Sequence, residues 1–377
     1  MQFLNKSVVF ILTIVLIFIL VPRPALSEMS DHGLEKEVKA LKEKVEKLGV
    51  LERLGERVGL SALVEVEASA GNGFNGVDES DIVLATVELG LDAEIAEYVK
   101  AHLQFLWEED DTEPIDMDEG TVTVGNTERF PVYFTAGKMY VPFGAFETNM
   151  IQDPLTLEIG ETNQSAIQVG FEVSGLCGSI YAFNGNIDEK EDPDDKDNEI
   201  KCFGANIGYA FEGDIMRLKL GADWINNIAD SKLLTDVFEE KNVDHIRDYV
   251  GGLALHLTFN LGSFTFIGEY VGATDEFHDG ELDFKGRGAR PRAWNIELAY
   301  TRDILGSETT FALGYQGTDE ALALELPKDR YLAAIGTGLV ENASITLEYL
   351  HDEDYSKSDG GTDDDANMVT FQLAVEF

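Results

Sequence analysis

The chain has 377 residues, and its 71 aspartates and glutamates against 28 lysines and arginines give a formal net charge of −43. Such an acidic surface repels phosphate backbones, which excludes nucleic-acid partners. The mean hydropathy of −0.10 is too low for a bundle of membrane helices, whereas 36 glycines beside 9 prolines suit many strands joined by tight turns.

The amino terminus has the features of an export signal. Lys6 precedes an apolar run from Val8 to Val21, and Ala25-Leu26-Ser27 forms a small-x-small cleavage site. We predict a signal peptide over residues 1–27, cleaved after Ser27. The alternative is an uncleaved membrane anchor, although the run is short for a bilayer span. No other apolar stretch is long enough for a spanning helix, so a membrane location requires a barrel.

Residues 28–57 are predicted to form a periplasmic coiled-coil helix. Its apolar seam has the 4, 3, 4, 3 spacing of a coiled coil and consists of Leu34, Val38, Leu41, Val45 and Leu48. One interpretation is that the helix associates protomers, with a homotrimer as the expected form. The other is a helical spacer lying against a barrel mouth.

From residue 58 to the end, segments of about ten residues alternate between apolar and polar side chains. In the last segment Val369, Phe371, Leu373, Val375 and Phe377 share one face. An alternating carboxy-terminal strand that ends on an aromatic residue is typical of outer-membrane barrels. A strand half-buried in a soluble protein would show the same period.

The recurring alternation predicts an all-β fold, a 16-stranded antiparallel transmembrane β-barrel over residues 58–377. The strands are expected at 59–70, 80–92, 94–107, 118–127, 131–140, 164–174, 176–186, 200–212, 214–225, 248–260, 262–273, 291–303, 307–317, 329–340, 342–351 and 366–377. With both termini in the periplasm, all the short turns are periplasmic and all the long loops extracellular. Barrels of this size enclose an aqueous channel.

The two cysteines test this arrangement. Pairing across the loop near Pro193 places Cys202 opposite Asn184, many residue pairs from Cys177. Cys177 shares a face with Tyr181, whereas Cys202 is expected on the glycine- and asparagine-rich face. We therefore predict no disulfide between them.

One long connection, residues 141–163, is unusually apolar for an extracellular loop. Phe143, Phe146 and Met150 would not remain in water, so we predict that it folds into the lumen and narrows it. The alternative is packing over the rim. Four charged residues are then expected in or near the constriction: Lys138, Asp153, Glu158 and Glu161.

Other charged side chains fall on the polar faces of the predicted strands. Lys100 and His102 share a face, as do Arg217 and Lys219. Glu269 and Glu297 also face the lumen, together with Glu65, Glu67, Glu88 and Glu348. Basic and acidic rows facing each other would create a transverse field, but each group could equally be a plain solvated residue. The acidic loops match no calcium motif, and no metal, cofactor or catalytic residue is predicted.

The segment A-G-K-M-Y-V-P-F-G at 136–144, followed by E-T-N-M-I-Q-D-P-L-T-L-E-I-G-E-T at 147–162, resembles the LbtU-type siderophore porins. The resemblance extends over nearly the whole mature chain and implies an outer-membrane barrel for ferric siderophore uptake. The first piece also resembles other specific porins.

The implied partners are a small-molecule solute such as a ferric siderophore, outer-membrane lipid and lipopolysaccharide. Sixteen strands leave no residues for a plug domain, so passage is expected to be passive.

Three alternatives remain beside the siderophore porin. One is a general or anion- or carbohydrate-selective porin. Another is a structural barrel whose coiled coil tethers the outer membrane. An enzyme is disfavoured because only six histidines are present and no G-x-S-x-G motif accompanies them.

Overall fold

The computed structural model describes residues 57–109, 115–189, 200–243 and 245–377. The predicted signal peptide and nearly all of the predicted coiled coil lie outside these ranges. The chain divides into two compact units, residues 1–59 with 92–94, and residues 60–91 with 95–377. The second unit holds the features discussed below.

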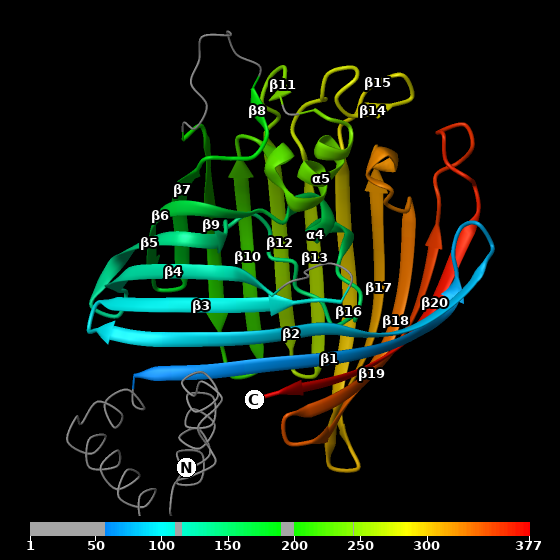
Figure 1. Ribbon diagram of the computed structural model, residues 1–377. Helices are drawn as coiled ribbons and strands as arrows, with labels where there is room; N and C mark the ends of the chain where they lie inside the picture. The colour runs from blue at the N-terminus through cyan, green and yellow to red at the C-terminus, as the bar shows by residue number, and fades with distance from the viewer. Residues whose placement is uncertain (1–56, 110–114, 190–199, 244) are drawn as a thin grey trace, which may run out of the picture. The chain divides into compact units, whose positions relative to one another are not determined.

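Sixteen strands form one closed antiparallel barrel in which neighbours in sequence are neighbours in space (Figure 1). The predicted 16-stranded barrel is thus confirmed. Its strands are β1 (Val58–Asn72), β2 (Asp78–Ala96), β3 (Val99–Trp107), β4 (Asp116–Asn126), β5 (Phe130–Tyr140), β6 (Asn163–Val173), β7 (Leu176–Phe183), β9 (Cys202–Glu212), β10 (Met216–Ile225), β12 (Gly252–Leu261), β13 (Phe264–Ala273), β16 (Arg292–Ile304), β17 (Ser307–Asp319), β18 (Asp329–Val340), β19 (Ala343–Glu353) and β20 (Asp365–Glu376).

The long connections hold small elements that the alternation did not predict. They are α4 (Leu155–Gly160), the pair β8 (Asp188–Glu189) and β11 (His245–Ile246), η1 (Ile228–Asp230), α5 (Lys232–Glu240), the pair β14 (Asp283–Phe284) and β15 (Arg287–Gly288), and η2 (Leu322–Leu324). Only α5, with nine residues, is long enough to show a helical period. The other elements, of two to six residues, are too short to show one in the sequence. Among the described residues, no helix has the length and apolarity needed to traverse a bilayer.

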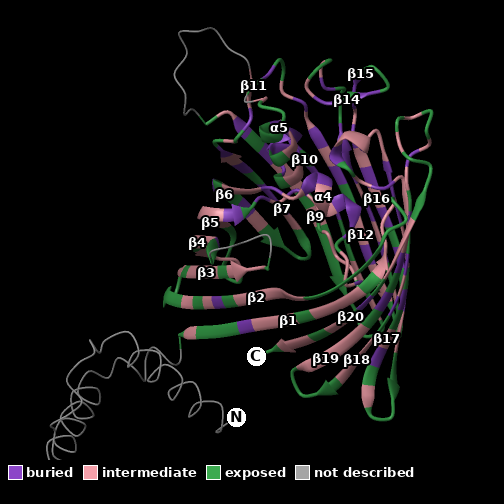
Figure 2. Ribbon diagram, turned by 45° about the vertical axis from the view of Figure 1, so that its right-hand side comes forward, coloured by how far each residue is buried: buried purple, intermediate pink, exposed green. Residues whose placement is uncertain are grey.

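The two faces of the barrel wall differ as the alternation predicts. Large apolar side chains point outward and are exposed on the isolated chain; Ile180 is 65% and Leu313 64% exposed. Inward positions on the same wall are buried; Ala254 and Gln316 are both 0% exposed. Figure 2 shows buried and exposed stretches side by side along the strands. An outward face this apolar requires an apolar surround.

The outward face is not uniform around the barrel. β1, β2 and β4 contain no aromatic residue. By contrast, β9, β13, β16 and β17 each place at least two aromatic residues outward, for example Phe264 and Phe266 on β13. The wall at β1 and β2 therefore lacks the aromatic side chains found elsewhere, whereas β3, which lies between β2 and β4, places Phe105 outward.

The last strand closes the barrel against the first. Val64 pairs with Val375 and Val66 with Leu373. The backbone of Phe377 both donates to and accepts from Ala62, at 3.0 and 2.7 Å. This pairing leaves the barrel without an open edge.

Both cysteines are free thiols, as predicted. Cys202 pairs with Phe183 across β7 and β9, and Cys177 pairs with Gly208, six residue pairs further along. The predicted difference in face is wrong. Phe183 shares the face of Cys177 along β7 and lies directly opposite Cys202, and Phe183 and Cys202 are both buried, so the two cysteines share the inward face. Distance along the strand keeps the thiols apart.

The main apolar core lies at the end of the barrel that carries the long loops, not in its middle. Phe143, Phe238, Phe277 and Tyr355 belong to one buried cluster, although they come from four different connections. These loops therefore pack against one another at this end.

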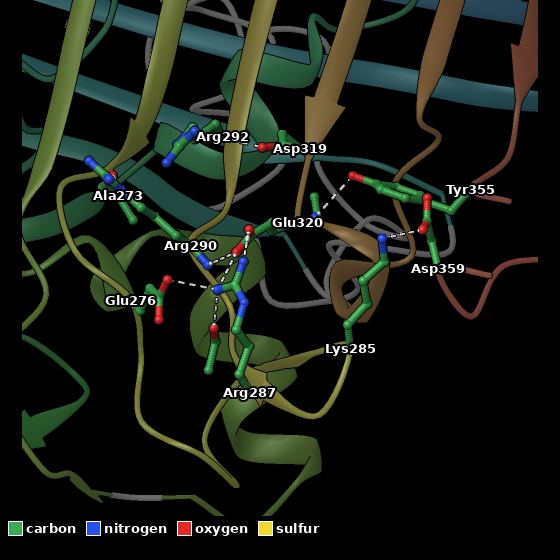
Figure 3. Close-up of polar contacts among 12 residues, drawn as sticks. Ala273, Glu276, Lys285, Arg287, Arg290, Arg292, Asp319, Glu320, Tyr355 and Asp359 are labelled. Carbon is green, nitrogen blue, oxygen red and sulfur yellow. Dashed lines mark hydrogen bonds and ion pairs between the residues drawn. The ribbon is translucent and has the colours of Figure 1, made fainter.

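Ion pairs join the same loops (Figure 3). Arg287, between β13 and β16, pairs with Glu276 at 2.8 Å and with Glu320 from the connection after β17. Lys285 pairs with Asp359 from the connection after β19. Arg287 and Lys285 are themselves half-exposed, so each pair contributes little alone, but together they link three connections.

Candidate pore constriction

The connection between β5 and β6, residues 141–163, lies against the inner face of the barrel. Its backbone contacts inward side chains of β10, β13, β16, β17 and β19. This is the placement predicted for the loop, rather than packing over the rim. Below it is called the lumen loop.

Gly137 and Gly144 permit the chain's path into this loop. Gly137 has φ 144°, and a Cβ there would lie 2.0 Å from the carbonyl oxygen of Gly120 on the neighbouring strand. Gly144 has φ 90°, and a Cβ there would lie 2.3 Å from the ring of Phe146. Both positions therefore require glycine.

Carboxylates of the wall hold the first part of the lumen loop. Asp223 accepts the backbone N–H of Gly144 at 2.9 Å. Glu269 accepts the backbone N–H groups of Ala145 at 2.7 Å and Phe146 at 3.2 Å.

Two more wall carboxylates hold the next residues in order. Glu297 accepts the backbone N–H of Asn149 at 3.0 Å and the hydroxyl of Thr148 at 2.9 Å. Glu348 accepts the backbone N–H of Ile151 at 2.6 Å. We call Asp223, Glu269, Glu297 and Glu348 the carboxylate row.

The carboxylate row meets two needs at once. An irregular loop lacks the backbone partners that a strand or helix provides, and buried N–H groups must be paired. A buried carboxylate is likewise tolerated only when donors surround it. Glu297 and Glu348 are each 1% exposed, so their charge is directed to the loop rather than to the lumen.

After the carboxylate row the loop forms α4, which packs on β13, β16 and β17. Leu155 N–H donates to the side-chain oxygen of Gln316 at 3.0 Å, and Thr156 donates its hydroxyl to Glu269 at 2.7 Å. Helix α5, from the connection between β10 and β12, packs against α4. Both helices lie near the long-loop end in Figure 1.

A cavity of about 680 Å³ lies between this part of the loop and the opposite wall. It is called the eyelet below. The described residues that line it include nine acidic side chains: Glu65, Glu67, Glu88, Glu108, Asp118, Asp153, Glu158, Glu161 and Asp236. Two basic side chains, Lys232 and Arg330, line it as well. Arg330 also binds Asp352 through two hydrogen bonds, of 2.8 and 3.0 Å.

A second cavity, of about 560 Å³, lies near the start of the lumen loop. Arg217 and Lys219 of β10 line it, together with Glu147 of the loop. Lys219 Nζ pairs with Glu147 at 2.9 Å. The predicted basic side chains of β10 thus line a different cavity from the eyelet acids.

The structure separates the predicted site residues into groups. Asp153, Glu158 and Glu161 line the eyelet. Lys100 and His102 pair with Thr123 and Thr121, and neither is among the residues lining the two cavities.

The predicted placement of Lys138 is corrected. It shares the outward face of β5 with Phe134, and its Nζ donates to the carbonyl oxygen of Met117 at 2.7 Å. Glu269 and Glu297 face inward as predicted, but the lumen loop covers them.

Lys232, Asp236 and Arg330 were not predicted as site residues. Arg330 lies on the polar face of a predicted strand, and this position is the sequence feature that could have identified it as a lumen residue. Lys232 and Asp236 lie in a long connection, where only the apolar spacing of Leu234 and Phe238 indicated a helix. Nothing in the spacing indicated that this helix enters the barrel.

Replacing Glu269 by alanine removes the acceptor of two backbone N–H groups and one hydroxyl. Each buried donor left unpaired costs about 1–3 kcal/mol, so we expect the lumen loop to loosen. Limited proteolysis of the folded barrel in detergent should then cut faster within residues 141–163. Glu341→Ala, in the exposed turn between β18 and β19, is the control. Equal cleavage rates for the two variants would contradict the anchoring role.

No family model matches the chain. A UPF0422 protein of Coxiella burnetii is 29% identical over 335 residues, which cover 87% of this chain and 70% of the relative. A UPF0422 protein of Legionella pneumophila, strain Paris, is 29% identical over 326 residues. The match covers 79% of this chain, but the chain spans only 59% of that relative's length.

Several solved structures share the fold. The outer membrane channel DcaP of Acinetobacter baumannii aligns with a TM-score of 0.59 at 14% identity, over 85% of this chain and 97% of that one. The anion-selective porin of Comamonas acidovorans aligns at 0.56 with 13% identity, over 85% and 99%. The trimer form of OmpT of Vibrio cholerae aligns at 0.53 with 12% identity, over 85% and 99%. The chain therefore has the barrel fold of outer-membrane porins.

Proposed function

We propose that this protein is an outer-membrane pore without a plug, through which small polar solutes diffuse. Three features support the proposal: the closed barrel with its apolar outer face, a loop that narrows the lumen without filling it, and the eyelet left beside that loop. The proposed membrane position places the carboxy terminus and the short turns in the periplasm. The outward side chains then contact membrane lipid and lipopolysaccharide.

The charge of the eyelet carries the proposal about selectivity. Nine acidic and two basic side chains line it among the described residues. Fixed charge of one sign in a confined space raises the local concentration of ions of the opposite sign. The pore should therefore favour cationic and neutral solutes over anions, which disfavours an anion-selective porin.

Ferric siderophores are the solute class that the resemblance of residues 136–162 implies. Within the selectivity proposed above, siderophore complexes of neutral or positive net charge fit best. Growth of a deletion strain on such a complex as the sole iron source tests this point. Growth equal to that of the parent strain would remove siderophores from the proposal and leave the pore itself intact.

We further propose that the barrel associates as a homotrimer through the sector of β1 and β2. Barrel faces in contact with lipid carry aromatic residues near both interfaces, and these two adjacent strands have none. Their apolar side chains, such as Val66 and Leu89, are exposed on the isolated chain. A second copy of the chain would cover them. Light scattering of the detergent-solubilised protein should give three chains per particle, and a monomer would contradict the proposal.

Purified protein in planar bilayers should conduct, and a KCl gradient should give a reversal potential that favours K⁺ over Cl⁻. The physical reason is the excess of carboxylates in the eyelet. Glu88→Gln, on the wall of the eyelet, should reduce the preference, whereas Glu341→Gln in the exposed turn should leave it unchanged. Absence of conductance, or a preference for Cl⁻, would refute the proposed function.

The preference for K⁺ over Cl⁻ should also depend on pH. The titrating group is Glu161, which lies in the lumen loop, outside the membrane-spanning strands. Burial raises the pKa of Glu161 to about 7; Lys232 opposes the rise, and Asp153 adds to it. The side chain is thus neutral below this pH and negative above it. We expect the preference for K⁺ to increase between about pH 6 and pH 8.

Glu161→Gln keeps the shape of the side chain but cannot ionise, so this increase should disappear. Glu341→Gln should retain it. An unchanged pH profile in the Glu161 variant would assign the titration to another group.

A further inference from the structure

The connection between β10 and β12, residues 226–251, brings a second helix into the barrel. β10 and β12 are the ninth and tenth of the sixteen strands, half the circumference away from β1 and β2. Yet Lys232 and Asp236 of α5 line the same eyelet as Glu65 of β1 and Glu88 of β2. The helix therefore projects from its own wall toward the opposite one.

Helix α5 meets the lumen loop directly. The backbone N–H of Lys232 donates to the carbonyl oxygen of Glu161 at 2.8 Å, just after α4 ends. Leu234 and Phe238, both 0% exposed, belong to the core cluster that also contains Phe143 and Ile159. One side of α5 is thus fixed in an apolar core while Lys232 and Asp236 line the cavity.

A buried acid fastens the start of this connection. Asp230 is 2% exposed and accepts the backbone N–H groups of Asn186 at 2.7 Å and Ile187 at 3.0 Å. It also accepts from the side chains of Asn227 and Cys202, both at 3.0 Å. Four donors on one carboxylate tie η1 to the β7–β8 connection and to the wall strand β9, so α5 starts from a fixed base.

We propose that residues 226–243 form a second constriction segment, and that Lys232 sets how tightly the eyelet holds cationic solutes. The inference rests on the proposed pore function. Conduction requires an ion to bind well enough to enter and weakly enough to leave. A cavity with nine acidic side chains would retain a dication, and the ammonium of Lys232 opposes that retention from the side facing β1 and β2.

The test measures block of K⁺ current by Ca²⁺ through the full-length protein in planar bilayers. Loss of one positive charge beside a dication should tighten the block by about three- to tenfold, as Coulomb's law gives for a separation near 8 Å in a watery pore. Lys232→Gln should show this tighter Ca²⁺ block, and Lys232→Arg, which keeps the positive charge, should block like the parent protein. Asp236→Asn, one turn along the same helix, should weaken the block.

Lys241→Gln is the matched control, because Lys241 is the exposed residue at the carboxy-terminal end of α5 and does not line the eyelet. If Lys232→Gln and Lys241→Gln channels show the same Ca²⁺ block, this inference is overturned, but the proposed pore function is unaffected. If the parent protein does not conduct at all, the proposed function itself has failed. Heat-modified mobility on gels verifies that each variant forms its barrel.

Discussion

The hydrogen bonds between wall carboxylates and the backbone of the lumen loop are the constraint on which the interior depends. Strands supply their own backbone partners, but a loop inside a barrel must find acceptors on the wall. Asp223, Glu269, Glu297 and Glu348 provide them in the order in which the loop passes the strands. The position of α4, and with it one side of the eyelet, follows from these contacts.

Carboxylates therefore serve two different purposes in this barrel. Those under the loop, such as Glu297, are surrounded by N–H and hydroxyl donors and are nearly inaccessible. Those across the cavity, such as Glu65 and Glu88, line open space. Under the loop, carboxylates stabilise the fold. Across the cavity, the same residue type creates an electric field that acts on solutes. What separates them is whether backbone donors face them.

The distribution of apolar packing fits a hollow barrel. The middle of the wall faces inward with polar or small side chains, and the main core forms where the long connections meet. Phe143 of the lumen loop and Phe238 of α5 belong to this core, so the two constricting segments share their apolar support. Ion pairs such as that between Arg287 and Glu320 join further connections at the same end (Figure 3). A change in one of these loops would thus be felt by its neighbours.

The sequence by itself determined the number of strands, their approximate bounds and the two faces of the wall. Alternation is a local property, because every outward residue meets an apolar surround and every inward one a wet or polar interior. Even the short segment predicted at 118–127 forms a strand, β4, which pairs on both sides. The inward placement of Glu269 and Glu297, and the inward course of the lumen loop, were also readable from side-chain chemistry.

Only the tertiary structure decided which of these groups face open space. Glu269 meets Ala145, and Glu348 meets Ile151, across more than a hundred residues of chain, and no local pattern encodes such a contact. Lys138 was expected in the constriction, but the regular continuation of β5 places it on the outward face. Lys232 reaches the eyelet because Asp230 and the apolar core fix α5 inside the barrel. Contacts of that range depend on the closure of the barrel, which brings distant segments to one place.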